Sequence, residues 1–181
     1  SIFIYSGSGA YASGIVLQNS QLLVGQGATA TIQAITGITP PAFSNALPAT
    51  GGSKPTIQNS GGDGIALAAN NLVRGLTAGN ASGSGLAGSN VGTLAVSEVI
   101  VNNATGGGIE VATGTLAVTL QSLTTTRSSD EGIDLTAVAG SFTVSAGSVS
   151  NTNSRAINID GNPSLALNVT LTSVSSSNTT K

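Results

Sequence analysis

The chain contains no cysteine, histidine, methionine or tryptophan among its 181 residues. Without cysteine it has no disulfides and no thiol nucleophile, and without histidine it lacks the commonest general base. Both absences also remove nearly every soft or borderline metal ligand, so carboxylates are the main metal ligands left. Much familiar enzyme and metal chemistry is therefore excluded.

Charged residues are also few. Five Lys and Arg and seven Asp and Glu give a formal net charge of −2, and residues 1–53 carry no charged side chain. A basic surface for nucleic acid or for an anionic membrane is therefore not expected. The apolar runs are short and interrupted by Gly, Asn or Pro, so membrane insertion is not expected either. The chain starts at Ser1 without a signal-peptide pattern, and we expect it to be a segment of a longer chain.

Gly, Ser, Thr and Asn make up nearly half of the chain, a composition that is also common in disordered segments. The apolar 39%, however, consists mainly of Val, Ile, Leu and Ala placed with a period of two. A disordered linker has no reason to keep this alternation, which is typical of β-strands. We therefore expect a folded all-β chain.

A short signature, Gly-Ile followed by two residues of which the second is usually apolar, recurs along the chain with small variations. It lies at residues 14–17, 64–67, 85–88, 108–111, 132–135 and 156–159. Two further apolar positions follow in most repeats, and the later repeats are 21 to 26 residues long. Three short strands per repeat cannot bury a core alone and must stack on their neighbours. The sequence therefore predicts one domain over residues 1–181, a right-handed single-stranded parallel β-helix of about seven to eight coils.

The alternation also predicts which side chains point inward. Ile133 and Leu135 would line the interior of the helix together with their equivalents in other repeats, while Glu110 and Asp134 would point outward. The Gly that begins each signature fits a corner where φ is positive or where two backbones come close. A leucine-rich repeat has a similar length, but no helical half is found in these repeats.

One segment interrupts the period. The signatures at Gly14 and Gly64 are 50 residues apart, which we interpret as two coils plus extra chain. Residues 36–55 hold four of the five prolines, and proline cannot donate to a β-ladder. This stretch is predicted to leave the solenoid as a surface loop, with Phe43 anchoring it to the outside of a sheet. It would brace the early coils or serve in recognition.

Several segments resemble the β-helix region of large bacterial extracellular proteins known as right-handed parallel β-helix repeat proteins. They are residues 4–5, 14–17, 22–27, 37–41, 55–57, 64–65 and 71–76. The resemblance covers essentially the whole chain and implies secretion or attachment to the cell surface. Proteins with this fold include pectate lyases, adhesins, autotransporter passengers and phage tailspikes. The resemblance transfers no catalytic residue.

Candidate chemistry rests on a few carboxylates. Glu110 and Asp134 would lie at the same outward position one coil apart, about 4.8 Å between backbones, with Asp130 and Glu131 nearby. Three of them, Glu110, Asp130 and Asp134, are candidates for retaining glycosidase chemistry, and all four are candidates for a calcium site. We favour a solvated face with no site. Arg155 is predicted to stack beside Glu131 as a surface ion pair, in preference to a lyase base.

These observations favour a non-catalytic extracellular module that is structural or adhesive, such as a stalk or filament component. The alternative is a β-helix that binds or degrades polysaccharide through Glu110, Asp130 and Asp134. No helical period is found that would cap either end, so further coils or further copies are expected to stack end to end. Thr115, Thr119, Thr143 and Thr170 are not expected to form a column, which argues against an ice-binding array.

Overall fold

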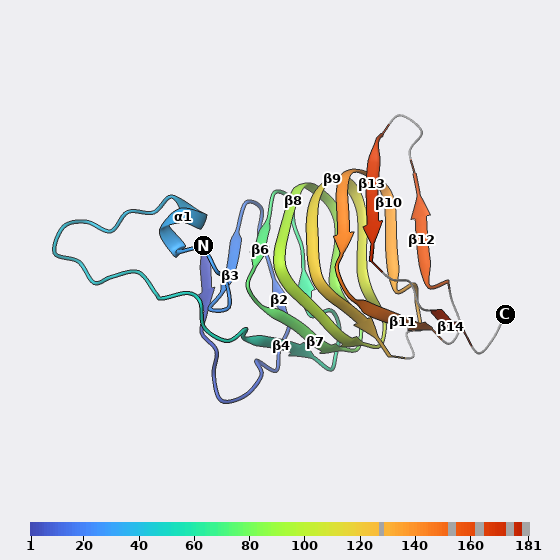
Figure 1. The fold of residues 1–181 in the computed structure, drawn as a ribbon, viewed down its shortest axis with the longest axis horizontal. Coiled ribbons are helices and arrows are strands. Elements are labelled where there is room, and N and C mark those ends of the chain that lie inside the picture. Colours follow the sequence, from blue (N-terminus) through green and yellow to red (C-terminus); the bar gives the residue numbers. More distant parts are fainter. Residues whose placement is uncertain (127–128, 152–154, 162–164, 173–175, 179–181) are drawn as a thin grey trace.

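A computed structural model describes residues 1–126, 129–151, 155–161, 165–172 and 176–178. The chain winds into a parallel β-solenoid of about seven turns, which stack along one axis from the N-terminal to the C-terminal end (Figure 1). Neighbouring strands of successive turns pair in parallel, and the predicted all-β solenoid is confirmed. Within the described ranges, the helix α1 (Ile32–Thr36) is the one α-helical segment.

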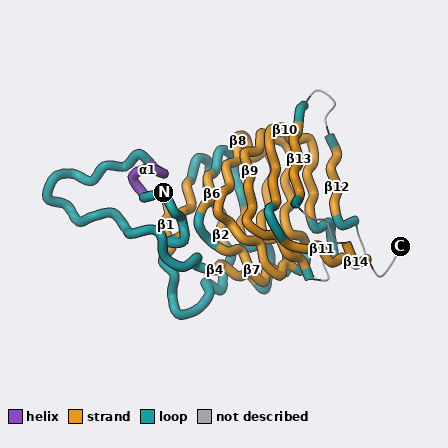
Figure 2. Tube along the Cα trace, in the orientation of Figure 1, coloured by secondary structure: helices purple, strands orange, loops and turns teal. Residues whose placement is uncertain are grey.

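The strands form three columns along the axis, as three apolar positions per repeat predicted (Figure 2). Column 1 contains β2 (Ile15–Val16), β5 (Ile65–Ala66) and β12 (Ile157–Asp160). Column 2 contains β1 (Ile2–Ile4), β3 (Leu22–Gly25), β6 (Leu72–Arg74) and β13 (Leu167–Leu171). Column 3 contains β4 (Thr56–Asn59), β7 (Thr77–Ala81), β11 (Gly147–Asn151) and β14 (Ser176–Asn178). Long strands bend through two or three columns: β8 (Ser84–Ala104), β9 (Gly107–Thr125) and β10 (Ile133–Val144).

The predicted inward and outward assignment is correct. Ile133 of β10 pairs with Ile109 of β9 and with Ile157 of β12, and both Ile109 and Ile133 are buried. Asp134, one residue further, pairs with Glu110 on the outside. Because the side-chain period of a strand is two, this register puts the inward aliphatics of the signatures from Ile65 to Leu135 into one continuous core.

The glycine that begins each signature is required by close approach of the backbones. A Cβ atom on Gly108 would lie 2.5 Å from the carbonyl oxygen of Gly132 on the next turn. The same contact would be 2.8 Å between Gly85 and Gly108. None of these three glycines has a positive φ, so of the two predicted reasons for glycine the close approach is the one that applies.

The interruption of the period is a single turn with a long insertion, and the interpretation as two coils was wrong. Ile15 of β2 pairs directly with Ile65 of β5, and Leu22 of β3 pairs with Leu72 of β6. The two signatures therefore lie on adjacent turns. The extra chain lies between β3 and β4, and it includes α1 as well as the predicted loop at residues 36–55. We call residues 26–55 the insertion.

Phe43 does not anchor the insertion, contrary to the prediction. Its side chain is fully exposed, at 108% of the reference area, and the loop that carries it projects away from the N-terminal end of the solenoid (Figure 1). A small apolar cluster on the outer face of column 2 anchors the insertion instead. Buried members of this cluster are Val24, Ala28 and Ile32, and partly buried members are Phe3, Ile35, Leu47 and Leu72.

The helix α1 was missed because it is only one turn long. Its N-cap is Thr31, whose Oγ1 accepts a hydrogen bond from the Ala34 amide at 3.2 Å. It ends at Gly37, which has the left-handed conformation (φ 71°) usual for a C-cap. Five residues are too few to produce a helical period in the sequence.

Three of the four threonines considered above share one register position, contrary to the expectation. Thr119 pairs with Thr143, and Thr143 pairs with Thr170, on the outer face of column 2. Thr115 belongs to a second position, which pairs with Thr93 on one side and with Ala139 on the other. The hydroxyl groups therefore form one column and a short fragment of a second.

The two ends of the solenoid differ. At the N-terminal end, the insertion covers the outer face of β1 and β3. At the C-terminal end, Ile159 of β12 is 44% exposed, although Leu135 one turn earlier in the same column is fully buried. No helix among the described residues has the length and apolar composition needed to cross a membrane.

Candidate functional site

Two of the four carboxylates predicted from the sequence, Glu110 and Asp134, lie on the outer face of column 1, while Asp130 and Glu131 lie in the loop before β10. Glu110 on β9 and Asp134 on β10 occupy one register position, and Ala87 on β8 precedes them at the same position. A shallow hollow of about 350 Å³ lies on this face, and Glu110 and Asp63 contribute its carboxylates. Its remaining lining consists of small or apolar residues: Ala66, Leu67, Ala87, Gly88, Ser89 and Ala112.

The side chains of Glu110 and Asp134 bind in opposite directions along the axis. Oε2 of Glu110 accepts a long hydrogen bond of 3.4 Å from the Ser84 hydroxyl, on the turn before it. Oδ1 of Asp134 accepts a hydrogen bond of 2.9 Å from the Asn158 side chain, on the turn after it. Each carboxylate is therefore hydrogen-bonded to a different neighbouring turn.

Ser84 links two carboxylates from neighbouring turns. Its backbone N–H donates to Oδ1 of Asp63 at 2.8 Å, while its hydroxyl donates to Glu110. On the other side, the Asn158 oxygen accepts a hydrogen bond of 2.8 Å from the guanidinium of Arg155. The polar groups of this face therefore form bridges between successive turns, which hold the coils in register.

The electrostatic environment of this face disfavours negative charge. Partial burial raises the pKa of Glu110, and the neighbouring charges of Asp130, Asp134 and Asp63 raise it further. The pKa of Asp130 is also raised, chiefly by a side-chain hydrogen bond with Glu131. Like charges gathered in this way cost stability unless a cation or a proton offsets them.

The calcium candidates from the sequence are Glu110, Asp130, Glu131 and Asp134. Within the ranges that the structure covers, no group of three or more Asp or Glu side chains is placed to hold a metal ion.

A second polar cluster, which the sequence analysis did not identify, fixes the root of the insertion. Glu98 accepts hydrogen bonds from Nε of Arg74 at 2.7 Å and from Nη2 of Arg74 at 3.1 Å, a bidentate ion pair. The backbone N–H of Thr29 also donates to Glu98 at 3.1 Å, and the Thr29 hydroxyl donates to its other oxygen. This cluster joins three segments: the insertion, β6 and β8.

The pKa values reflect this arrangement. The hydrogen bond from Arg74 lowers the pKa of Glu98 to about 2, with further lowering from Thr29. The pKa of Lys54, whose ammonium lies 3.5 Å from the Gly27 carbonyl oxygen, is lowered by burial, with an opposing effect of Glu98. Glu98 is therefore a fixed negative charge at the base of the insertion, whose one charged side chain is Lys54.

The sequence analysis did not identify Glu98, because the alternation of inward and outward residues is broken at this position. It lies next to the outward position that Ser97 occupies, at a bulge with a φ of 56°, so a strict alternation does not assign it to a face. Arg74 lies at that outward position on the previous turn, opposite Ser97. A charge pair 24 residues apart, one repeat length, is the signal that could have identified it.

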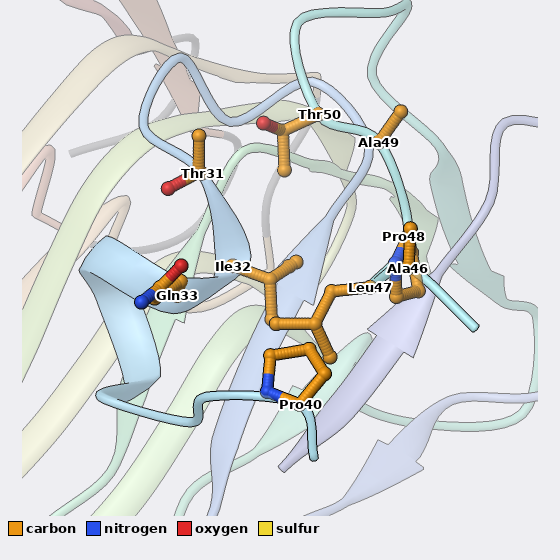
Figure 3. A pocket seen from close by; sticks show the side chains of 9 residues that line it. All are labelled: Thr31, Ile32, Gln33, Pro40, Ala46, Leu47, Pro48, Ala49 and Thr50. Atoms are coloured by element: carbon orange, nitrogen blue, oxygen red, sulfur yellow. The ribbon is translucent and has the colours of Figure 1, made fainter. Parts of the chain in front are cut away.

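A pocket of about 480 Å³ lies between α1 and the returning loop segment 46–50 of the insertion (Figure 3). Ile32 and Leu47 converge at its centre beside Pro40 (Figure 3). The other lining residues are uncharged: Thr31, Gln33, Ala46, Pro48, Ala49 and Thr50. Its lining contains no acid, base or nucleophile other than hydroxyls.

The loop beyond this pocket ends in a β-turn that displays Phe43. The Ser44 amide donates to the Pro41 carbonyl at 3.2 Å, which places Phe43 at the third position of the turn. Its φ of 65° is left-handed, a conformation that normally selects Gly or Asn at this position. A bulky aromatic residue there is under backbone strain. Its ring is fully exposed, so no packing within the molecule offsets this strain.

Comparison with known proteins gives no relative. The chain matches no protein-family model, no curated protein and no solved structure. What the chain can do must therefore be inferred from the geometry of these two regions.

Proposed function

We propose that the chain is a non-catalytic structural or adhesive module of the cell surface or extracellular space. In this role the solenoid serves as a rigid body, and its ends and its insertion make contacts with other protein. The resemblance of its repeats to bacterial extracellular β-helix proteins supports the location. The absence of His and Cys from the sequence is in keeping with a structural role.

The observation that carries this proposal is the direction of the polar contacts. Asp63, Glu110 and Asp134 each hydrogen-bond to a neighbouring turn, and Glu98 binds Arg74 and Thr29 across three segments. These groups stabilise the stacking of turns. A catalytic site would instead bring its polar groups together around an open space for a reacting atom.

The exposed core at the C-terminal end supports contact with further coils. Ile159 has the register of a core residue, because it continues the column of Val111 and Leu135, yet its side chain is 44% exposed. A further parallel turn, from the same parent chain or from another copy, would cover it and continue the column beyond β12, which among the described strands pairs only with β10.

Sedimentation velocity of the 181-residue chain over a range of concentrations tests this contact. We expect the unmodified chain to form a concentration-dependent series of oligomers, because head-to-tail contacts do not close. Ile159→Lys should suppress the series by placing a charge at the exposed end. Asn168→Lys is the matched control, since Asn168 is an exposed outward residue of β13 and gains the same charge. A chain that stays monomeric, or equal effects of the two variants, would contradict end-to-end stacking.

The second candidate function is polysaccharide binding on the face of column 1. The hollow beside Glu110 and Asp63 is the observation that favours it, because a shallow groove on a parallel sheet suits an extended sugar chain. Aromatic side chains are missing from its lining, although they are the usual platforms for sugar rings. Carbohydrate binding there would depend on hydrogen bonds alone.

A further inference from the structure

The insertion carries an exposed aromatic side chain, Phe43, and an uncharged pocket. Phe43 does not line this pocket. Phe43 lies at the tip of the loop and is fully exposed, while Ile32 and Leu47 line the pocket at its root. Both belong to the first 53 residues, which carry no charge. An uncharged surface of this kind is suited to a neutral, apolar partner.

The conformation and exposure of Phe43 are both unfavourable for the isolated chain. A left-handed φ costs a bulky residue about 1 to 2 kcal/mol, and an exposed ring forgoes roughly 1.5 to 3 kcal/mol of burial. Glycine would fit this turn without strain. A residue that is unfavourable in both respects for the isolated molecule is explained if another surface buries the ring.

The backbone of the loop is also restricted before any partner binds. Pro40, Pro41 and Pro48 restrict its backbone, and the contacts of Glu98 with Thr29 fix its root to the solenoid. A loop that is ordered before it binds loses less conformational entropy on association. The entropic cost of burying Phe43 in a partner is thereby reduced.

We infer that the insertion is a self-association arm, in which Phe43 of one copy inserts into the Ile32–Leu47 pocket of a second copy. The pocket is large enough for a phenyl ring, and its lining contains no charge that the ring would have to desolvate. Because each copy offers one ring and one pocket on the same arm, the exchange is reciprocal. It produces a closed two-fold dimer joined at the N-terminal ends.

End-to-end stacking needs an exposed C-terminal end and this contact does not, so blocking the C-terminal end lets the two be measured separately. The reference protein carries Ile159→Lys, which blocks the C-terminal end. In that background, sedimentation velocity should show a monomer–dimer equilibrium with no larger species. Phe43→Gly should weaken the dimer by about tenfold or more, while the turn is retained because Gly favours its φ.

Two further variants distinguish the ring from the pocket. Ala46→Glu adds a charge to the exposed edge of the pocket and should weaken the dimer as strongly as Phe43→Gly. When the two variants are mixed, one supplies the ring and the other the pocket, so a heterodimer with a single contact should form. Val16→Thr is the control, because it removes an exposed apolar side chain from β2, outside the arm, at nearly constant volume.

Three results would overturn the proposal. The first is a reference protein that stays monomeric at millimolar concentration. The second is a dimer that Phe43→Gly and Val16→Thr weaken equally. The third is a mixture of Phe43→Gly and Ala46→Glu that shows no heterodimer while both variants melt cooperatively, as monitored by circular dichroism. None of these results would bear on the stacking at the C-terminal end, since Ile159 is blocked throughout.

Discussion

Glu110 and Asp134 are register partners on adjacent turns, yet their carboxylates are held by opposite neighbours, Ser84 on one side and Asn158 on the other. The backbone alone would place two such carboxylates at a separation suited to glycosidase chemistry. Their hydrogen bonds give each of them a different partner. The face of column 1 is thus better explained by contacts between turns than by catalysis.

The inward and outward register gives the most direct prediction about stability. Ile133→Asp places a carboxylate in the aliphatic core, where the native side chain is 3% exposed, and it should prevent folding or cost more than about 4 kcal/mol. Asp134→Ala, one residue further, should cost less than about 1 kcal/mol, since it removes only partly exposed hydrogen bonds. Urea denaturation of both variants provides the comparison, and equal losses would mean that the register is wrong.

The close approach of glycines at the corner predicts a second contrast. Gly108→Ala should destabilise the chain by about 2 kcal/mol or more, because the new Cβ would lie 2.5 Å from the Gly132 carbonyl oxygen and 2.9 Å from a methyl group of Leu123. Gly9→Ala is the control, since a Cβ added to Gly9 would meet no other atom within 4 Å. Thermal melting of the two proteins measures the difference. A Gly108→Ala protein as stable as the control would show that the turns are not stacked this closely.

Glu98 predicts how stability depends on pH. Its pKa of about 2 in the folded state lies below the value of about 4.3 for an unfolded chain. The stabilisation by Arg74 and Thr29 is therefore complete above about pH 5 and is lost as the pH falls towards 2. Glu98→Gln should lose about 1 to 2 kcal/mol at pH 7 and should remove this part of the acid sensitivity. Denaturation at pH 7 and at pH 3 measures both effects.

Glu110→Gln is the matched comparison, because the pKa of Glu110 is shifted upward. A carboxylate that is harder to ionise in the folded state opposes folding at neutral pH, so its neutral analogue should be as stable as the native chain or slightly more stable at pH 7. If both glutamine variants lose the same stability at pH 7, the assignment of Glu98 as a stabilising charge would be wrong.

The sequence predicted the parts of the structure that repeat. Ile109, Ile133 and Ile157 share one register because the same alternation returns at each turn, and parallel stacking leaves no other arrangement. The insertion could not be predicted in this way. It occurs once, its helix is a single turn, and the apolar contacts that hold it to the outer face of column 2, with Val24 and Leu72, follow no repeat.

For the candidate site, the sequence predicted the backbone positions of the carboxylates but not the hydrogen-bond partners of their side chains. Adjacent placement of Glu110 and Asp134 followed from the repeat, but the choice of partners by their side chains depends on Ser84 and Asn158. The contact of Glu98 with Arg74 depends on a bulge that breaks the alternation. Side-chain partners on an exposed face are set by such local details, which periodicity does not encode.

The measurement that most directly tests the non-catalytic structural role is polysaccharide binding and turnover. The native chain and the double variant Glu110→Gln/Asp134→Asn should be compared on a broad sugar array and in assays for new reducing ends and for unsaturated products. We predict that the two proteins behave alike and release no product. A polysaccharide that the native chain binds specifically or cleaves, and that the double variant does not, would contradict the structural account.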